Sequence, residues 1–283
     1  MARLIHLSDM HFGAHDPRIV EAVAVRVNEE KPDLVVISGD FTQRAHTDQF
    51  QEACAFIERL HGAGHEVLAV PGNHDVPLYD VVRRFLSPLT RYKRYIDDEL
   101  CPFHQLADAA VLGVNTARSF TFKNGHVSHE QMQFIRDSFA DTDPHQPRIL
   151  VTHHPLFALP VGDGPKLGHV MDDQQTALEA IAEAGVDLLL AGHNHRASVS
   201  DATKLAKGAG KSLVIQAGTA TSTRVRGETQ SFNRIEIDQT GCRVTIIRWD
   251  GSAFVTGDSE WFERHGEQWE LASGEPVEQA PAA

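Results

Sequence analysis

The sequence is poor in cysteine and in basic residues for its length. Its three cysteines, Cys54, Cys101 and Cys242, are spread over 283 residues, so we expect reduced thiols and no disulfide framework. Lys and Arg together number 26 against 39 Asp and Glu, which gives a formal net charge of −13. General nucleic-acid-binding proteins carry a basic surface, so we expect no general nucleic-acid binding.

Long apolar runs are missing as well. No run approaches the roughly 18 residues that a membrane-spanning helix needs, and no signal-like segment precedes the first apolar run at Leu4. We therefore expect a cytoplasmic protein. With 41% hydrophobic residues, the chain is long enough for one large core. We predict one domain over 1–265, a cap-like excursion within it at 76–104, and a disordered tail at 266–283. The sequence gives no basis for an oligomeric state.

Five short apolar runs each end in polar residues of the types that bind metal ions. The runs and their polar residues are 4–8 with Asp9-Met10-His11, 34–38 with Gly39-Asp40, 67–71 with Gly72-Asn73-His74-Asp75, 149–152 with His153-His154, and 188–191 with Gly192-His193-Asn194-His195. Each run is typical of a buried strand. In an open α/β sheet, ligands bind outside the carboxyl ends of the strands, so we expect these polar groups to meet.

The polar groups offer carboxylate, imidazole and amide oxygen ligands, which suit Mn, Fe or Zn. A lone histidine is more often a structural or surface residue, so it is their joint occurrence that favours a metal centre. Seven ligands are too many for one tetrahedral ion, and they suit two ions roughly 3.5–4 Å apart that share a carboxylate. The candidate metal ligands are Asp9, His11, Asp40, Asn73, His153, His193 and His195.

These blocks together resemble the calcineurin-like metallophosphoesterases, whose pattern is D-x-H, G-D, G-N-H-[DE], H and G-H-x-H in that order. The segments 38–43 and 152–155 are most similar to the bacterial class III cyclic-nucleotide-phosphodiesterase-like branch. The resemblance implies an α/β fold with four layers, in which two mixed β-sheets pack face to face between α-helices.

By this resemblance, two overlapping sets of side chains would hold two ions, with Asp40 as the bridge. His74 would not be a ligand and would stabilise or protonate the leaving group. Asp75 would orient the ring of His74 or serve only as a turn carboxylate. Because neighbours on an extended chain point to opposite faces, only one of His153 and His154 is a ligand, and the pattern favours His153. The two sets are Asp9, His11, Asp40 and His195 for the first ion, and Asp40, Asn73, His153 and His193 for the second.

The function that the resemblance implies is hydrolysis of a small phosphoester. We expect a phosphodiester, with cyclic nucleotides as one candidate substrate, attacked by a hydroxide that bridges the two metal ions. One alternative is a phosphomonoesterase, and another is a lipid-linked phosphodiester hydrolase that docks through the basic segment 83–94. A third is a non-catalytic scaffold that keeps the metal site.

Three further segments carry structural expectations. The excursion 76–104 is predicted to be helical with a solvated basic face, and it would otherwise be a cap for phosphate-bearing substrates or a peripheral membrane contact. The loop 155–170, which contains His169, has the length of a functional lid. The apolar runs at 213–216, 231–237 and 243–249 are predicted to form a second, largely antiparallel sheet.

Overall fold

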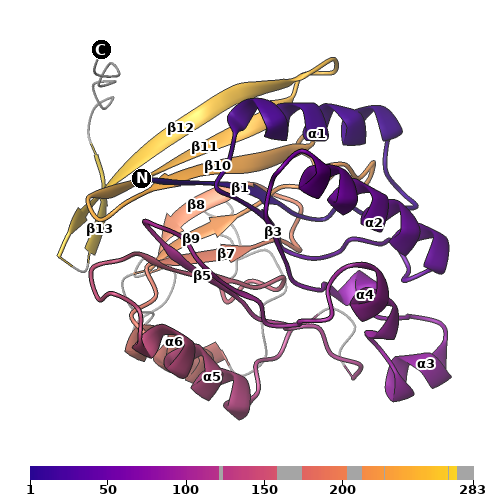
Figure 1. The fold of residues 1–283 in the computed structure, drawn as a ribbon, viewed down its shortest axis with the longest axis horizontal. Coiled ribbons are helices and arrows are strands. Elements are labelled where there is room, and N and C mark those ends of the chain that lie inside the picture. Colours follow the sequence, from indigo (N-terminus) through magenta and orange to yellow (C-terminus); the bar gives the residue numbers. More distant parts are fainter. Residues whose placement is uncertain (121–123, 158–173, 203–211, 226, 267, 273–283) are drawn as a thin grey trace.

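The computed structural model describes residues 1–120, 124–157, 174–202, 212–225, 227–266 and 268–272. In these residues two β-sheets lie face to face, and helices cover their outer faces (Figure 1). The predicted architecture of two mixed sheets between helices is confirmed. The lid expected at 155–170 falls, from residue 158 onward, outside the described residues.

The first sheet joins a parallel half to an antiparallel half. Its strand order is β13-β12-β11-β10-β1-β2-β3. Strands β1, β2 and β3 are parallel, and β10 begins the antiparallel half on the other side of β1. The bounds are β1 (Ala2–Leu7), β2 (Leu34–Ile37), β3 (Val67–Ala69), β10 (Ser231–Ile237), β11 (Gly241–Trp249), β12 (Phe254–His265) and β13 (Gln268–Leu271).

The second sheet has a parallel centre and antiparallel edges. Its order is β4-β5-β6-β7-β9-β8, in which β5, β6, β7 and β9 are parallel. The edge strands β4 and β8 each run antiparallel to their neighbour. The bounds are β4 (Phe103–Gln105), β5 (Ala110–Gly113), β6 (Arg148–Val151), β7 (Leu188–Ala191), β8 (Ser198–Asp201) and β9 (Leu213–Gln216).

Each sheet is buried on both faces because its central strands are apolar throughout. Leu4 and Val36 of the first sheet pack in one cluster with Ile149 and Leu190 of the second, which forms the core between the sheets. The alternate side chains, such as Ile5 of β1, point outward to the helices. Side chains in a strand alternate between its two faces, so a continuous apolar run serves both cores.

Helices close the two outer layers. Helices α1 and α2 pack on the first sheet, and α5 and α6 pack on the second. None of the described helices is long and apolar enough to cross a membrane. The helix bounds are α1 (Pro17–Glu30), α2 (Thr47–Gly62), α3 (Val81–Leu86), α4 (Thr90–Tyr95), α5 (His129–Ala140) and α6 (Gln174–Glu183), with a 3₁₀ turn, η1, at Asn73–Asp75.

The strands after residue 210 do not form a sheet of their own, so that prediction was wrong. Strand β9 joins the second sheet beside β7, while β10 and β11 extend the first sheet from β1. The physical reason is that β1 pairs with β2 on only one side. Its other edge would be left unpaired, and an antiparallel strand covers it.

The predicted start of the disordered tail, at residue 266, is also too early. Residues Gln268–Leu271 form β13, which pairs with β12 and buries Trp269 to 4% exposure. The guanidinium of Arg264 lies 5.7 Å from the centre of the Trp269 ring. One large aromatic side chain thus anchors a segment whose composition is otherwise polar. Residues 273–283 lie outside the described part of the chain.

We predict that Trp269→Ala lowers the free energy of unfolding by about 2–4 kcal/mol, because it removes a buried aromatic side chain. Chemical denaturation measures the change. Leu271→Ala is the matched control on the same strand, since Leu271 is 56% exposed, and it should change the free energy by less than about 0.5 kcal/mol. Equal effects of the two substitutions would contradict the anchoring role of Trp269.

Candidate metal centre

The carboxyl ends of five strands meet in one place and bring the seven candidate ligands together. The contribution of the first sheet is Asp9 and His11 after β1, Asp40 after β2 and Asn73 after β3. The contribution of the second sheet is His153 after β6, and His193 with His195 after β7. The centre therefore lies between the two sheets and depends on both.

Asp9, His11 and His195 form one side of the cluster. Oδ1 of Asp9 lies 3.1 Å from Nε2 of His195 and 3.6 Å from Nε2 of His11, and these two nitrogens are 3.1 Å apart. The other carboxylate oxygen of Asp9 accepts hydrogen bonds from the Ser8 hydroxyl at 2.7 Å and the His193 amide at 2.9 Å. Ser8 and the backbone thus fix the carboxylate, while Oδ1 is buried with no aligned donor.

Asp40 lies between this side and the other. Its Oδ2 is 3.7 Å from Nε2 of His11 and 3.4 Å from Nε2 of His153. The same nitrogen of His153 is 3.2 Å from Oδ1 of Asn73 and 3.3 Å from Nδ1 of His193. Asp40 therefore lies between two groups of candidate ligand atoms.

Backbone carbonyls fix the tautomers of three histidines. A carbonyl only accepts, so a ring nitrogen that bonds to it must carry the proton. In each of these rings Nδ1 is therefore the donor, so Nε2 is the nitrogen that a metal ion would bind, in place of any proton it carries, as in histidines that bind metal. The pairs are His153 with Ser38 at 2.7 Å, His195 with Arg224 at 3.2 Å, and His74 with Gln43 at 2.7 Å.

The backbone at the centre is bent in a way that side-chain-bearing residues seldom adopt. Among the described residues, five of the seven non-glycine positions with positive φ are candidate ligands. Left-handed backbone is uncommon for residues with a Cβ atom and clusters at functional sites. The five are Asp9 (53°), His11 (49°), Asp40 (54°), His193 (70°) and His195 (56°).

Two glycines permit the close approach of the strand ends. A Cβ atom on Gly72 would overlap the Asp40 carboxylate, and one on Gly192 would overlap the Ser8 hydroxyl and lie 2.7 Å from Oδ2 of Asp9. Any side chain at either position would push a carboxylate out of place. The lack of space for a Cβ atom explains why glycine stands in the G-N-H-D and G-H-x-H blocks.

The two buried carboxylates are ionised and need positive charge nearby. Burial alone would raise the pKa of Asp9, but the imidazoles of His195 and His11 hold it well below its usual range. Burial likewise opposes ionisation of Asp40, and the charge of His153 lowers its pKa. In return, Asp40 overcomes the effect of burial on His153 and raises the pKa of that imidazole to about 9. A cation bound here would replace the proton in this role.

The donor set fits metal ions. Two groups of side chains, Asp9 with His11 and His195, and Asp9 with Asp40 and His153, place their ligand atoms within 4.8 Å of one another. The fixed tautomers turn lone pairs inward, and the donors are the carboxylate and imidazole types that Mn, Fe and Zn accept.

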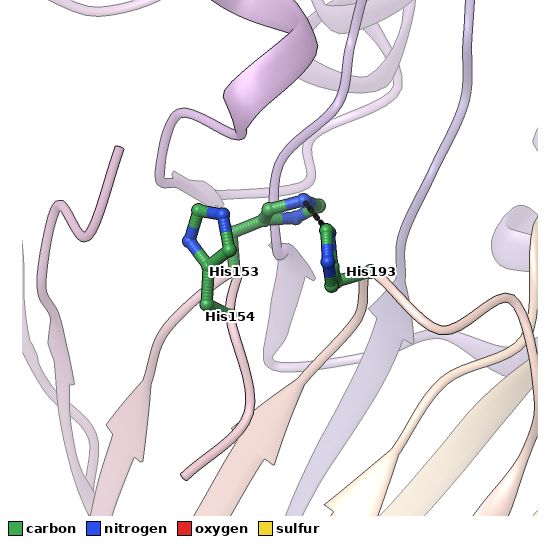
Figure 2. Close-up of side chains that lie close together, drawn as sticks. All are labelled: His153, His154 and His193. Atoms are coloured by element: carbon green, nitrogen blue, oxygen red, sulfur yellow. Dashed lines mark hydrogen bonds between the residues drawn. The ribbon is translucent and has the colours of Figure 1, made fainter. Parts of the chain in front are cut away.

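His154 belongs to the cluster, although the sequence argument set it aside. Figure 2 shows its ring beside those of His153 and His193, and the three place ligand atoms within 4.8 Å of one another. Nδ1 of His154 lies 2.8 Å from the Thr116 hydroxyl, whereas Nε2 makes no hydrogen bond. Burial, with the charges of His153 and His193, lowers the pKa of His154 well below its usual value, so the ring is neutral.

Among the described residues no hydrogen bond joins the carboxylate of Asp75 to the ring of His74, although a role in orienting that ring would require one. Its carboxylate accepts hydrogen bonds from the backbone amides of Phe41, Thr42 and Gly72, at 3.2, 2.9 and 2.9 Å. Burial and the nearby charge of Asp40 raise its pKa to about 6. Asp75 therefore holds the loops after β2 and β3 together, and the carbonyl of Gln43 orients His74 instead.

Sequence reasoning missed the residues that act through their backbone or that support a ligand. Gln43 and Arg224 hold histidine rings through carbonyl groups, so their side chains carry no signal. The Thr219 hydroxyl donates to the Asp9 carbonyl at 2.7 Å, and the Thr221 hydroxyl to the Met10 carbonyl at 2.6 Å. Ser8 closes the apolar run 4–8 directly before Asp9, and Gln43 ends the segment 38–43 already noted in the sequence.

The chain belongs to the calcineurin-like phosphoesterase family, whose profile matches residues 2–197 of the 283. The match confirms the resemblance seen in the motifs. Members of this family use a dimetal centre, and the Asp and His cluster is compatible with one.

Curated relatives are named phosphodiesterases, at low identity. The chain is 23% identical over 217 residues to the glycerophosphodiester phosphodiesterase GpdQ of Enterobacter lignolyticus, covering 70% of this chain and 72% of that protein. It is 26% identical over 206 residues to a probable cyclic nucleotide phosphodiesterase of Rhodococcus erythropolis, covering 68% and 64%. It is 25% identical over 170 residues to the 3',5'-cyclic adenosine monophosphate phosphodiesterase CpdA of Escherichia coli, covering 55% and 56%. The family and these names together support a hydrolase.

Solved structures share the fold. A dimetal phosphatase from Danio rerio superimposes with a TM-score of 0.62 at 14% identity, covering 90% of this chain and 98% of that chain. The purple acid phosphatase PPD1 of yellow lupin gives a TM-score of 0.67 at 14% identity, covering 91% and 53%. At this identity the likeness establishes the architecture alone.

We predict that Gly192→Ala weakens metal binding by about 10- to 100-fold, because the new Cβ displaces Ser8 and the carboxylate of Asp9. Titration calorimetry of chelator-stripped protein with Mn²⁺ measures the affinity. Gly62→Ala is the control, since a Cβ there meets no atom within 4 Å. An unchanged affinity in Gly192→Ala would contradict the assignment of Asp9 as a ligand.

Proposed function

We propose that this phosphoesterase hydrolyses a phosphodiester with the help of two metal ions. The observation that carries the proposal is the convergence of two ligand groups on Asp40, with His74 beside them. The ring of His74 packs edge-on against that of His11 at a centroid distance of 4.9 Å. A site that held one ion would not need ligand atoms on both sides of Asp40.

The proposed ligand sets are those given by the family pattern. Asp9, His11 and His195 with Asp40 would hold one ion, and Asn73, His153 and His193 with Asp40 would hold the other. When bound, such a pair of ions supplies a nucleophile at neutral pH and neutralises charge on the phosphoryl group. The protein holds the carboxylates in place through Ser8, the backbone amides and the left-handed turns, so the ligands do not need to reorganise.

His74 is proposed to act on the leaving group. Its amide donates to Oδ1 of Asp40 at 2.8 Å, which ties it to the bridging carboxylate. Its Nδ1 donates to the Gln43 carbonyl at 2.7 Å, so Nε2 is the nitrogen that faces away from this anchor. When the ring is protonated, Nε2 donates a proton to the departing oxygen of the ester.

The preference for a diester is supported by the relatives. The three described above are named as phosphodiesterases of glycerophosphodiesters or of cyclic nucleotides. The retention of His74 and of every candidate ligand favours an enzyme over a scaffold, since a scaffold has no need of a group that protonates a leaving oxygen.

We predict that hydrolysis depends on the metal ions. Chelator-stripped protein should hydrolyse bis(4-nitrophenyl) phosphate only after Mn²⁺, Fe²⁺ or Zn²⁺ is added back, because the ligands alone offer no nucleophile. Asp40→Asn should lose at least about 100-fold in kcat/KM. Asp98→Asn is the matched control, since its carboxylate is 90% exposed. Faster hydrolysis of 4-nitrophenyl phosphate than of the diester would keep the site and overturn the substrate class.

We also predict that the effect of removing His74 depends on the leaving group of the substrate. His74→Ala should lower kcat by roughly 100-fold or more for a diester with an alkyl alcohol as leaving group, which needs a proton to depart. It should lower kcat by less than about 10-fold for a 4-nitrophenyl diester, whose phenolate departs without one. His61→Ala, at an exposed position in the last turn of α2, is the control. Equal losses for both substrates would remove His74 from this role.

A further inference from the structure

Helix α3 reverses the usual arrangement of a surface helix, in which apolar side chains are buried and charged ones are exposed. One of its two arginines, Arg84, is 3% exposed, whereas its apolar side chains face solvent. Val82 is 70% exposed and Leu86 is 82% exposed. The predicted solvated basic face of the excursion is therefore only half present on this helix, because Arg84 points inward whereas the Arg83 side chain is 41% exposed, and the apolar side chains point outward.

Polar anchors, and not apolar burial, hold α3 in place. The guanidinium of Arg84 donates to the carbonyl of Ser119 at 2.7 Å and to that of Pro77 at 3.0 Å. Arg91 of helix α4 likewise donates to the carbonyl of Ala45 at 2.6 Å. The hydrophobic side chains of the helix stay largely exposed in the described part of the chain, with only Phe85 packed against another aromatic ring, that of Phe120.

The exposed apolar side chains form one surface, which we call the apolar tip. The rings of Phe85 and Phe120 lie 5.2 Å apart, so the tip includes residues from two segments. It holds seven of the fourteen large hydrophobic side chains that are exposed in the described residues, which is clustering and not scatter. The members are Leu78 (38%), Tyr79 (71%), Val81 (62%), Val82 (70%), Phe85 (47%), Leu86 (82%) and Phe120 (86%).

We propose that the apolar tip pairs with the tip of a second copy of this chain. From these exposed fractions and side-chain areas on the order of 150–200 Å², the tip presents roughly 800 Å². A standard stable interface buries about 800 Å² on each partner, so the tip has the size that a dimer needs. Identical surfaces that pair about a twofold axis form a closed dimer, in which each copy covers the other.

The charge pattern favours a second copy over an anionic lipid surface. Neither arginine of helix α3 offers a free charge to a lipid head group, because Arg83 lies 3.4 Å from the carboxylate of Asp80 and Arg84 donates to backbone carbonyls. The whole chain carries −13, which an anionic membrane repels. A neutral apolar patch is the part of the surface where two such molecules can approach without repulsion.

The position of the tip places the partner beside the candidate metal centre. Helix α3 lies at the outer edge of the molecule (Figure 1) and follows the η1 turn that contains His74. The guanidinium of Arg44 lies 5.1 Å from the centre of the Tyr79 ring, and Arg44 follows Gln43, whose carbonyl holds His74. A partner on the tip would therefore lie beside the loop that orients His74.

Sedimentation velocity over a concentration series tests the pairing without any measurement of turnover. The wild-type chain should sediment as a dimer at micromolar concentration. Val82→Asp and Leu86→Asp should each weaken dimerisation by about 100-fold or more, because each buries a carboxylate at the interface. Leu271→Asp is the control, since Leu271 is exposed on the edge strand β13. Unchanged thermal unfolding and unchanged Mn²⁺ affinity of the monomeric variants would show that the fold and the metal centre remain intact.

Three outcomes would overturn the proposal. A wild-type chain that stays monomeric at about 100 µM lacks the affinity that an interface of standard size provides. Tip variants that remain dimeric would place the interface elsewhere. A monomer that co-sediments with phosphatidylcholine vesicles, and whose Leu86→Asp variant does not, would assign the tip to a lipid surface.

Discussion

The structure depends on how closely carboxylate and imidazole side chains are packed at the carboxyl ends of five strands. The carboxylates of Asp9 and Asp40 and several imidazoles form groups whose ligand atoms lie within 4.8 Å of one another, and five of these residues adopt left-handed backbone. Each such residue costs roughly 1–2 kcal/mol relative to ordinary backbone. The cost is offset by a ladder between the loops, in which the amides of Asp9 and His11 donate to the carbonyls of Gly39 and Asp40, at 3.1 and 2.9 Å.

This arrangement explains why so many supporting residues surround the centre. A hydroxyl from Ser8, a carboxylate from Asp75 and carbonyls from Gln43 and Arg224 each fix one group that would otherwise move. The glycines of two motif blocks remove side chains that would collide with Asp40 and Asp9. The site is rigid because its strained turns are held from several sides at once.

Much of the fold and most of the candidate site could be predicted from the sequence. The apolar runs indicated the parallel strands, and the polar residues after them indicated which side chains would meet. The pairing of β10 with β1 could not be predicted, because an edge strand is chosen by which backbone remains unpaired and not by its own composition. The burial of Trp269 was missed because a single aromatic residue in a polar segment gives no periodic signal.

The role of Asp75 could not be predicted from the sequence either. A carboxylate after a histidine suggests a pair, but the direction of its side chain follows from the η1 turn, which aims it at three backbone amides. The orientation of helix α3 could not be predicted, because a prediction from hydrophobic periodicity places the apolar side chains of a helix inward. In that helix the carbonyls of Pro77 and Ser119 bind Arg84, and the direction is reversed.

The division of the candidate ligands between the two sheets has a thermodynamic consequence. Asp9 and Asp40 belong to the first half of the chain, and His153 and His193 belong to the second, so ions held by both sets would join the halves as a cross-link does. Ligand binding to the folded state alone stabilises it in proportion to the logarithm of the free ion concentration. The resistance of the fold to heat would then be a property of the surrounding medium as much as of the amino-acid sequence.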